Sequence, residues 1–347
     1  MRGNFVWRRL RDTLKLAVAS LIRNEIDIVG AYLQHLDALF DYAVLMDHHS
    51  IDGTDRVVAQ ACARRPGWAL WHVEPVGFHQ FAFSEFAMHH LFRHTDTDIV
   101  VFLDADEFLA VPDRAALEAN LARLTDPDRI GRLRWRHLVP ERLDTRAITP
   151  SETFWRAPNL AAVDKMVIPR IFHLRHGHEL HVAPGNHYLT YDPQTRVPSD
   201  PIGEILHLPI RSHEQLKGKV LAAVFAVLQL ATRAPRQSWH RFDILWRIAD
   251  GALRDEDLIG IAAHYSEAGV QGTKRMSHSE LAAGGYTRTT LDVAFGRPLP
   301  PVTEPLSIDP VRLVANILRQ FQLEDTRTNT LLLDGDRLRF ASQVSQP

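Results

Sequence analysis

Short apolar runs alternate with longer amphipathic segments through the first 110 residues of the chain. The runs are rich in valine, isoleucine and leucine and too short for typical helices. They lie at 14–22, 42–46, 68–73 and 99–103. The segments between them place apolar residues at helical spacing, at 25–39, 55–64 and 84–94, the last with Ser84 as its cap. Because alternating strands and helices form parallel sheets covered on both faces, we predict an α/β fold.

The pattern beyond residue 110 is less regular. A helix is predicted at 114–124, a strand at 132–138, a loop at 139–160 and a short strand at 205–208. A further strand at 165–174 contains Pro169, which favours an edge or interrupted strand.

The last part of the chain reads as mainly helical. A helix is predicted at 211–231, and Asp334-Gly335 is typical of the turn in a terminal β-hairpin. We therefore assign residues 14–230 to one α/β domain and 231–347 to a mainly helical C-terminal extension.

Composition narrows the class of protein. The 347 residues are 45% hydrophobic and 24% charged, as in ordinary globular proteins. The net charge of −2 gives no global basic field, so we expect no nucleic-acid partner. The single cysteine, Cys62, forms no internal disulfide. The longest apolar stretch, 220–228, is well short of the roughly 20 residues of a membrane span. With no convincing secretory signal, we expect a soluble, cytoplasmic protein and leave peripheral membrane association open.

Three carboxylates follow the apolar run at 99–103. Asp104, Asp106 and Glu107 would stand at the carboxyl end of a buried strand, the edge at which open α/β sheets bind ligands. Burying such charges is costly unless a cation joins them. The simplest cation is a divalent metal shared with a substrate phosphate. The alternative is that these residues merely cap a following helix.

Four segments in order resemble a family-2-type glycosyltransferase of the GT-A fold. They are the Arg-Asn-Glu after the first strand, Asp-x-x-Ser-x-Asp-Gly-Thr, Asp-x-Asp, and a late strand with histidine that leads into a helix. In this chain they lie at 21–25, 47–54, 104–108 and 205–212. The chain departs from the family at His48 and His49, where small or polar residues are more usual.

The resemblance implies a GT-A fold, a Rossmann-like and mostly parallel sheet, and a metal-dependent, inverting sugar transfer. The donor would be a nucleotide-sugar, UDP-sugar by default, and the acceptor a polysaccharide, other glycan, lipid or other hydroxyl compound. Asp104 and Asp106 would hold Mn²⁺ or Mg²⁺, with Glu107 behind them.

Further residues are candidates from their positions. His207, at the end of a short strand, is a candidate third metal ligand, because a neutral imidazole suits Mn²⁺ better than Mg²⁺. The remaining candidates would contact the nucleotide. Asp47 and Asp52 would face the nucleoside, Asn24 and Glu25 follow the first strand at the same edge, and Lys165 would offset diphosphate charge. Turn formation, a helix N-terminal charge and a surface lysine are the alternatives for Asp52, Glu25 and Lys165.

The general base is the least constrained role, because no spacing singles out one residue. Glu141, Glu179 and His181 lie in loops expected on the acceptor side, and Glu141 and His181 are our candidates. The five histidines between 173 and 187 could instead form a second metal site, although their spacing matches no zinc pattern. Trp135, Trp155 and Phe172 would stack on a sugar or pack in the core.

Two other functions compete with glycosyl transfer. A nucleotidylyltransferase acting on a sugar phosphate would use a related sheet, but its usual glycine-rich loop is missing, since no glycine precedes Gly30 after the first strand. A non-catalytic module that binds glycan or nucleotide is the third hypothesis, which the intact Asp-x-Asp disfavours.

Overall fold

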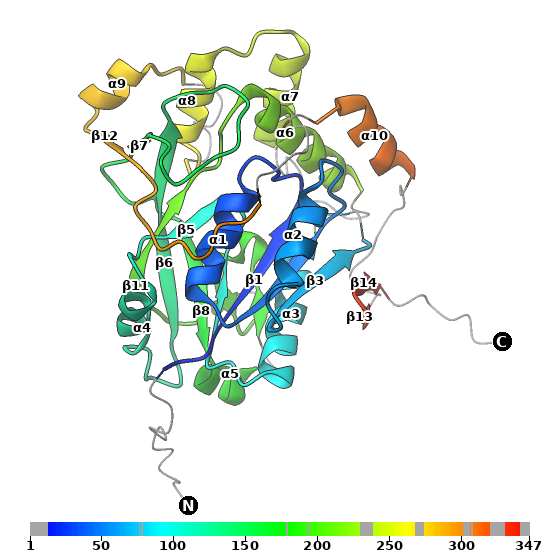
Figure 1. Ribbon diagram of the computed structural model, residues 1–347, viewed down its shortest axis with the longest axis vertical. Helices are drawn as coiled ribbons and strands as arrows, with labels where there is room; N and C mark the ends of the chain where they lie inside the picture. The colour runs from blue at the N-terminus through cyan, green and yellow to red at the C-terminus, as the bar shows by residue number, and fades with distance from the viewer. Residues whose placement is uncertain are drawn as a thin grey trace, which may run out of the picture.

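A computed structural model gives the architecture of the chain (Figure 1). The structure describes residues 13–75, 77, 79–177, 180–192, 194–229, 239–267, 274–300, 306, 308–319 and 330–340.

Twelve strands within these described ranges form one mixed sheet. Its parallel half consists of β3 (Trp68–Val73), β2 (Tyr42–Asp47), β1 (Leu16–Ile22) and β4 (Ile99–Phe102), paired in that order. Alternate side chains of β1 and β2 enter the cores on opposite faces of the sheet, which explains why these runs are apolar throughout. The predicted α/β class and the parallel strands are confirmed.

The other half of the sheet is largely antiparallel. β8 (Asp164–Pro169) pairs antiparallel with both β4 and β6 (Ile130–Pro140), and β11 (Ser199–His207) runs parallel to β6. β5 (Glu107–Leu109) pairs antiparallel with β11, while β7 (Phe154–Arg156) and β12 (Thr287–Thr289) continue outward from β6.

One strand prediction in this half was right only in that the strand is interrupted at its proline, and one loop prediction was wrong. The strand predicted at 165–174 ends at Pro169, where the missing N–H disturbs the ladder least, and α5 (Arg170–His176) follows. Strand β8 is internal, between β4 and β6, rather than at an edge of the sheet. The expected loop at 139–160 includes the end of β6 and all of β7, because the two strands pair as a hairpin.

Helices cover both faces of the sheet. On one face α1 (Val29–Leu39), α2 (Thr54–Cys62) and α4 (Arg114–Leu121) pack into one core, and on the other α3 (Gln80–His94) and α5 pack into a second. Helix α3 begins at Gln80, so the predicted cap at Ser84 is wrong. Buried Phe83, one turn before Ala87, extends the apolar stripe past the expected start.

The C-terminal third adds helices and a hairpin. The helices are α6 (His213–Leu228), α7 (Trp239–Ala249), α8 (Asp255–Ala263), α9 (His278–Ala283) and α10 (Pro310–Arg319). Of these, α6 to α9 lie at the top in Figure 1, beyond the carboxyl ends of the parallel strands. The predicted hairpin is confirmed as β13 (Leu331–Asp334) and β14 (Arg337–Phe340), with Gly335 at φ +61°, and β14 joins the sheet parallel to β3.

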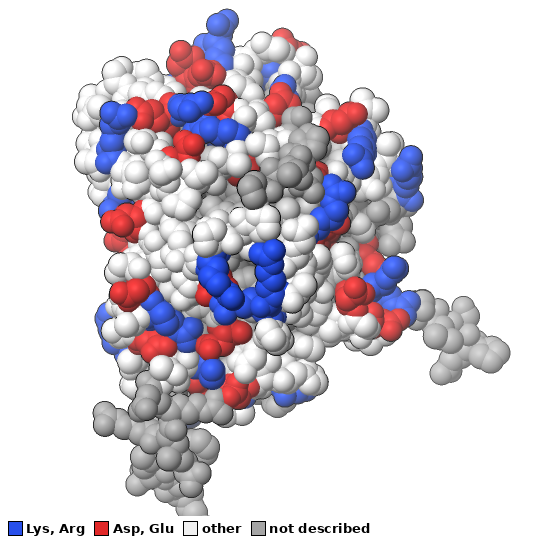
Figure 2. All heavy atoms as spheres, viewed as in Figure 1, with Lys and Arg blue, Asp and Glu red and all other residues white. Residues whose placement is uncertain are grey.

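The face of the molecule seen in Figure 2 carries charges of both signs. Lys and Arg are interspersed with Asp and Glu on the face seen in Figure 2, in keeping with the net charge of −2. None of the helices in the described ranges combines the length and the apolar character needed to cross a membrane.

Candidate functional site

A cavity of about 500 Å³ lies at the carboxyl ends of the parallel strands. Its polar wall comes from the segments that follow β1, β2 and β4, and from β11. Helices α6, α7 and α8 supply an apolar wall opposite, including Leu216, Ile244 and Ile261. The segment at Pro184–Asn186 (η1) closes one side. This is the edge at which the sequence predicted ligand binding.

Strand register brings the segment at 104–107, which we call the acidic turn, next to His207. The β5–β11 ladder pairs Glu107 with His207, and the Leu208 N–H donates to the Asp106 carbonyl at 2.8 Å. The turn itself is held by the Asp104 N–H, which donates to Glu107 Oε2 at 2.9 Å. His207 therefore meets the acidic turn because β11 returns antiparallel to β5.

Asp106, Glu107 and His207 can share a metal ion. Each offers a ligand atom, these atoms lie within 4.8 Å of one another, and all three side chains are buried. Burial lowers the pKa of His207 well below its usual value, so its ring is neutral, as a metal ligand must be. His207 Nδ1 lies 3.2 Å from His137 Nδ1, while its Nε2 faces Asp106 Oδ1 at 3.8 Å. Two carboxylates with an imidazole fit Mn²⁺.

Asp104 is bound by protein groups instead. Its Oδ1 accepts from Gln80 Nε2 at 3.0 Å, and its Oδ2 accepts from Lys165 Nζ at 2.6 Å. Lys165 also lies 3.3 Å from Glu107 Oε1 and is completely buried. Although burial opposes its charge, these carboxylates raise the pKa of Lys165 above its ordinary value. Lys165 thus neutralises the acidic turn from beneath.

Lys219 of α6 approaches the same turn from the cavity side. Its Nζ donates to Asp106 Oδ2 at 2.6 Å and to the Pro209 carbonyl at 3.2 Å. Burial opposes ionisation of Asp106, but the charge of Lys219 outweighs burial and holds the pKa of Asp106 below its usual range. Asp106 is therefore a fully ionised carboxylate at neutral pH.

Glu25 belongs to a second buried ion cluster. Arg211, 1% exposed, donates to both oxygens of Asp27 at 2.7 and 2.9 Å and also pairs with Glu25. Burial, partly offset by Arg211, raises the pKa of Glu25 to about 7. Glu25 also lines the cavity, so it belongs both to the ion cluster of Arg211 and to the candidate site.

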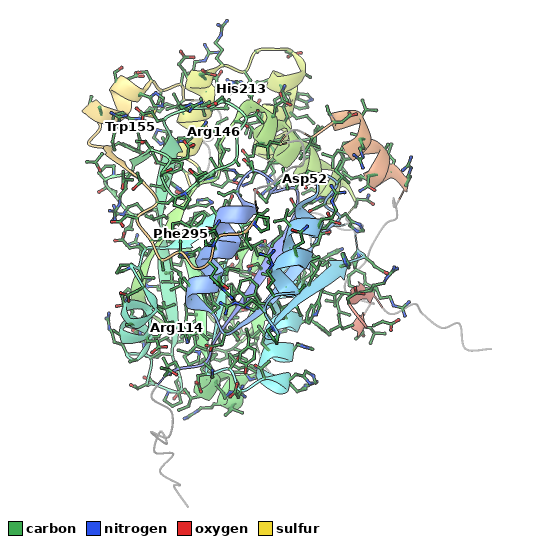
Figure 3. The ribbon with its side chains drawn as sticks, viewed as in Figure 1. Asp52, Arg114, Arg146, Trp155, His213 and Phe295 are labelled. Carbon is green, nitrogen blue, oxygen red and sulfur yellow. The ribbon has the colours of Figure 1, made fainter. Side chains whose placement is uncertain are left out.

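The nucleoside candidates lie after β1 and β2. Asp52, labelled in Figure 3 at the start of α2, accepts from the Ile26 and Thr54 N–H groups, and this accounts for turn formation. Asn24 Oδ1 accepts from the Ile51 N–H at 2.8 Å. Asp47 Oδ2 accepts from the Ser50 N–H at 3.2 Å, while its buried Oδ1 has no hydrogen-bond partner. Burial raises the pKa of Asp47 to about 6.

Arg23 was not among the predicted site residues. It lines the cavity next to Asp47, and its buried Nε and one terminal nitrogen have no hydrogen-bond partner. Burial, partly offset by Asp47, lowers the pKa of Arg23 to about 10, so it stays charged. The sequence offered one signal, a basic residue directly after a buried strand.

Both candidate general bases lie away from this cavity. Glu141 accepts two hydrogen bonds from Arg288, and His181 is exposed and lines a separate pocket beside α3. Glu179 lies outside the described residues. We therefore carry neither Glu141 nor His181 into the proposal below.

The predicted histidine cluster does not converge among its described members. His173 contacts His89, and His176 contacts Asp128. Of these histidines only His187 lines the cavity, and His178 lies outside the described residues. The candidate stacking residues differ too, since Trp135 lines the cavity, whereas Phe172 is in the core and Trp155 stacks on His278.

His187 has the geometry of a proton acceptor. Its Nδ1 lies 2.9 Å from the Asp164 carbonyl, which can only accept, so Nδ1 carries the proton and Nε2 has a free lone pair. Burial and then the charge of Lys165 lower the pKa of His187, so the ring is neutral at pH 7. It packs edge-on against Trp135 at 5.3 Å between ring centroids.

Comparison with known proteins gives distant structural similarity alone. No family model and no curated protein match the chain. A structure of S. aureus TarS aligns over 74% of this chain with 14% identity and a TM-score of 0.34, and the chain spans 44% of that TarS chain. TarS residues 1–349 in complex with UDP-GlcNAc align over 73% of both chains with 13% identity and a TM-score of 0.37. Because these scores are low, the function is inferred from the site's own residues.

Proposed function

We propose that the protein is a glycosyltransferase that moves a sugar from a nucleotide-sugar donor to a hydroxyl acceptor, with inversion. The observation that carries the proposal is the convergence of Asp106, Glu107 and His207 with the cations Arg23 and Lys219 around one cavity at the carboxyl edge of the sheet. A nucleoside diphosphate needs this combination of a metal-binding group and positive side chains.

Asp106, Glu107 and His207 would hold Mn²⁺ or Mg²⁺, with Asp104 beside them on Lys165. When bound, the ion would stabilise the negative charge of the diphosphate leaving group. Arg23 lines the cavity and would pair with the diphosphate, whereas Asp47 lies beside Arg23 and is not part of the cavity lining. Uridine remains the default base, and the cytoplasmic location remains a prediction.

His187 is our choice of general base in place of the sequence candidates. Its Nε2 would take the proton of the acceptor hydroxyl as the oxygen attacks the anomeric carbon, and the bond from that carbon to the diphosphate would break and release the nucleoside diphosphate. Trp135 lies next to His187 and stacks on His207 at 4.0 Å between ring centroids, so it would hold these two histidines in place rather than stack on a sugar ring.

Thermal unfolding with UDP, GDP, CDP and dTDP, each with and without Mn²⁺, tests the proposal. A ligand that binds the folded state at 100 times its Kd adds about 2.7 kcal/mol, which raises Tm by several degrees. We expect such a rise with one nucleotide, and only when Mn²⁺ is present. No rise with any pair would contradict the proposal.

A pair of variants ties the shift to the site. Asp106→Asn should abolish the nucleotide shift because it removes a charged ligand, whereas Asp292→Asn, at an exposed carboxylate, should keep it. Release of UDP from UDP-sugars should likewise be lost in Asp106→Asn and kept in Asp292→Asn. Pyrophosphate release from a nucleoside triphosphate and a sugar phosphate would instead indicate a nucleotidylyltransferase.

A further inference from the structure

Lys219 is the cation at the acidic turn that has room to move. Its side chain is 28% exposed and lines the cavity, although its Nζ is bonded to Asp106. Lys165, with a completely buried side chain on an internal strand, has no such space. Because a lysine side chain is a flexible four-carbon stem, Lys219 can leave Asp106 without any movement of α6.

Asp106 presents its two oxygens to different partners. Oδ2 accepts from Lys219, while Oδ1 faces His207 Nε2 within the metal-binding group. A divalent ion held by this group would share the carboxylate with an ammonium. Two positive charges at such short range in a buried site repel each other strongly. Lys219 in its present position therefore competes with a metal for Asp106.

A diphosphate in the cavity would give Lys219 another partner. Lys219 and Arg23 both line this cavity, and lysine ammonium groups bind phosphate well as point charges. We propose that Lys219 is an exchangeable counter-cation, which neutralises Asp106 in the free protein and moves to the donor diphosphate when a divalent ion binds Asp106. This inference rests on the proposed function, and it makes metal and nucleotide binding cooperative.

The electron paramagnetic resonance signal of free Mn²⁺ measures this coupling without turnover. Wild-type protein is titrated with Mn²⁺ in the presence and absence of UDP, and Lys219→Met is treated in the same way. In wild type we expect UDP to tighten Mn²⁺ binding about tenfold or more. In Lys219→Met we expect Mn²⁺ alone to bind about tenfold more tightly than in wild type, and most of the gain from UDP to be lost.

Three further variants separate charge exchange from a change in structure. Lys217→Met removes a lysine of the same helix that pairs with Glu214, and it should behave as wild type. Lys219→Arg keeps the positive charge and should keep weak Mn²⁺ binding in the absence of UDP. If Lys219→Met does not fold, Lys219→Gln removes the charge while keeping a hydrogen-bond donor, and it should show the same tighter Mn²⁺ binding.

The outcomes distinguish the exchange from the transferase function. If UDP tightens Mn²⁺ binding equally in wild type and Lys219→Met, the exchange is overturned and the transferase proposal stands. Equal or weaker Mn²⁺ binding by Lys219→Met and Lys219→Gln without UDP also overturns the exchange. A wild type whose Mn²⁺ affinity responds to none of UDP, GDP, CDP and dTDP overturns both, and the thermal shift would then be absent as well.

Discussion

Arg211 and Lys219 both pair with buried carboxylates near the carboxyl edge of the sheet, but their surroundings differ. Arg211 is 1% exposed and holds Asp27 through two hydrogen bonds, with Glu25 as a second partner. Lys219 is 28% exposed, donates one short bond to Asp106 and lines the cavity. The buried Arg211–Asp27 pair, which we call the closed pair, can only hold the fold together. The partly exposed Lys219–Asp106 pair, which we call the open pair, can exchange partners with a ligand.

The largest expected difference between the two cations is in stability. Arg211→Met leaves two buried carboxylates without their partner and should lower the free energy of unfolding by about 3–5 kcal/mol. Lys219→Met should cost about 1–2 kcal/mol, because water in the cavity can take the place of the ammonium. Urea denaturation measures both. Equal losses of unfolding free energy in the two variants would show that Arg211 and Lys219 do not differ in their contribution to stability.

A matched control for the closed pair is Arg129→Met. Arg129 donates to both oxygens of Asp200, as Arg211 does to Asp27, but both partners are partly exposed. Surface pairs of this kind contribute about 0–1 kcal/mol. A loss as large as that of Arg211→Met would show that burial is not the deciding factor.

Next in size is the expected effect of His187 on turnover. His187→Gln should lower kcat/KM for the UDP-sugar substrate about 10²-fold with little change in the KM of the donor, since the base acts on the acceptor. The pKa of His187 is lowered, so wild-type kcat/KM should fall as pH drops through a value below 6.5. His187→Gln should lose this acidic limb, whereas His213→Gln, on the outer end of α6, should keep it.

His35 is a histidine that, unlike His187, is completely buried and away from the cavity. Its Nδ1 donates to the Ala294 carbonyl and its Nε2 accepts from the Leu109 N–H. Burial lowers its pKa to about 4, so between pH 6.5 and 4 the unfolded chain binds a proton that the folded chain does not. Stability contributed by His35 is therefore lost as pH falls through this window, by up to about 3 kcal/mol.

The variant that isolates this contribution is His35→Gln. It should be less stable than wild type at pH 7, yet its free energy of unfolding should fall less steeply between pH 6.5 and 4.5. Urea denaturation at several pH values checks the slopes. Parallel slopes would assign the acid sensitivity to other groups.

Most strands of the parallel half of the sheet could be predicted from the sequence, because each is a continuous apolar run bounded by turn residues. The same logic located Asp104, Asp106 and Glu107 at the sheet edge. Local pattern could not show that Pro169 ends an internal strand, since the position of β8 depends on pairing with β4 and β6, which are distant in sequence.

The cations of the site were harder to predict than its carboxylates. Lys219 lies on a helix whose approach to Asp106 depends on how β11 pairs with β5, and no local signal encodes that register. The base candidates Glu141 and His181 were chosen by residue type in unplaced loops, and type alone could not separate them from His187. Side chains that meet through long-range strand pairing are beyond local sequence patterns.

The hairpin β13–β14 has a consequence for how the molecule avoids self-association. β14 pairs with β3, although Arg337 and Glu74 are 263 residues apart in the chain. Until the hairpin has been made, β3 presents unpaired backbone groups, and such edges recruit strands of other molecules. Synthesis runs from the N-terminus, so the nascent sheet keeps this edge open from the completion of β3 until residues 331–340 have been made. A chain truncated before residue 330 would carry the same open edge permanently and should aggregate.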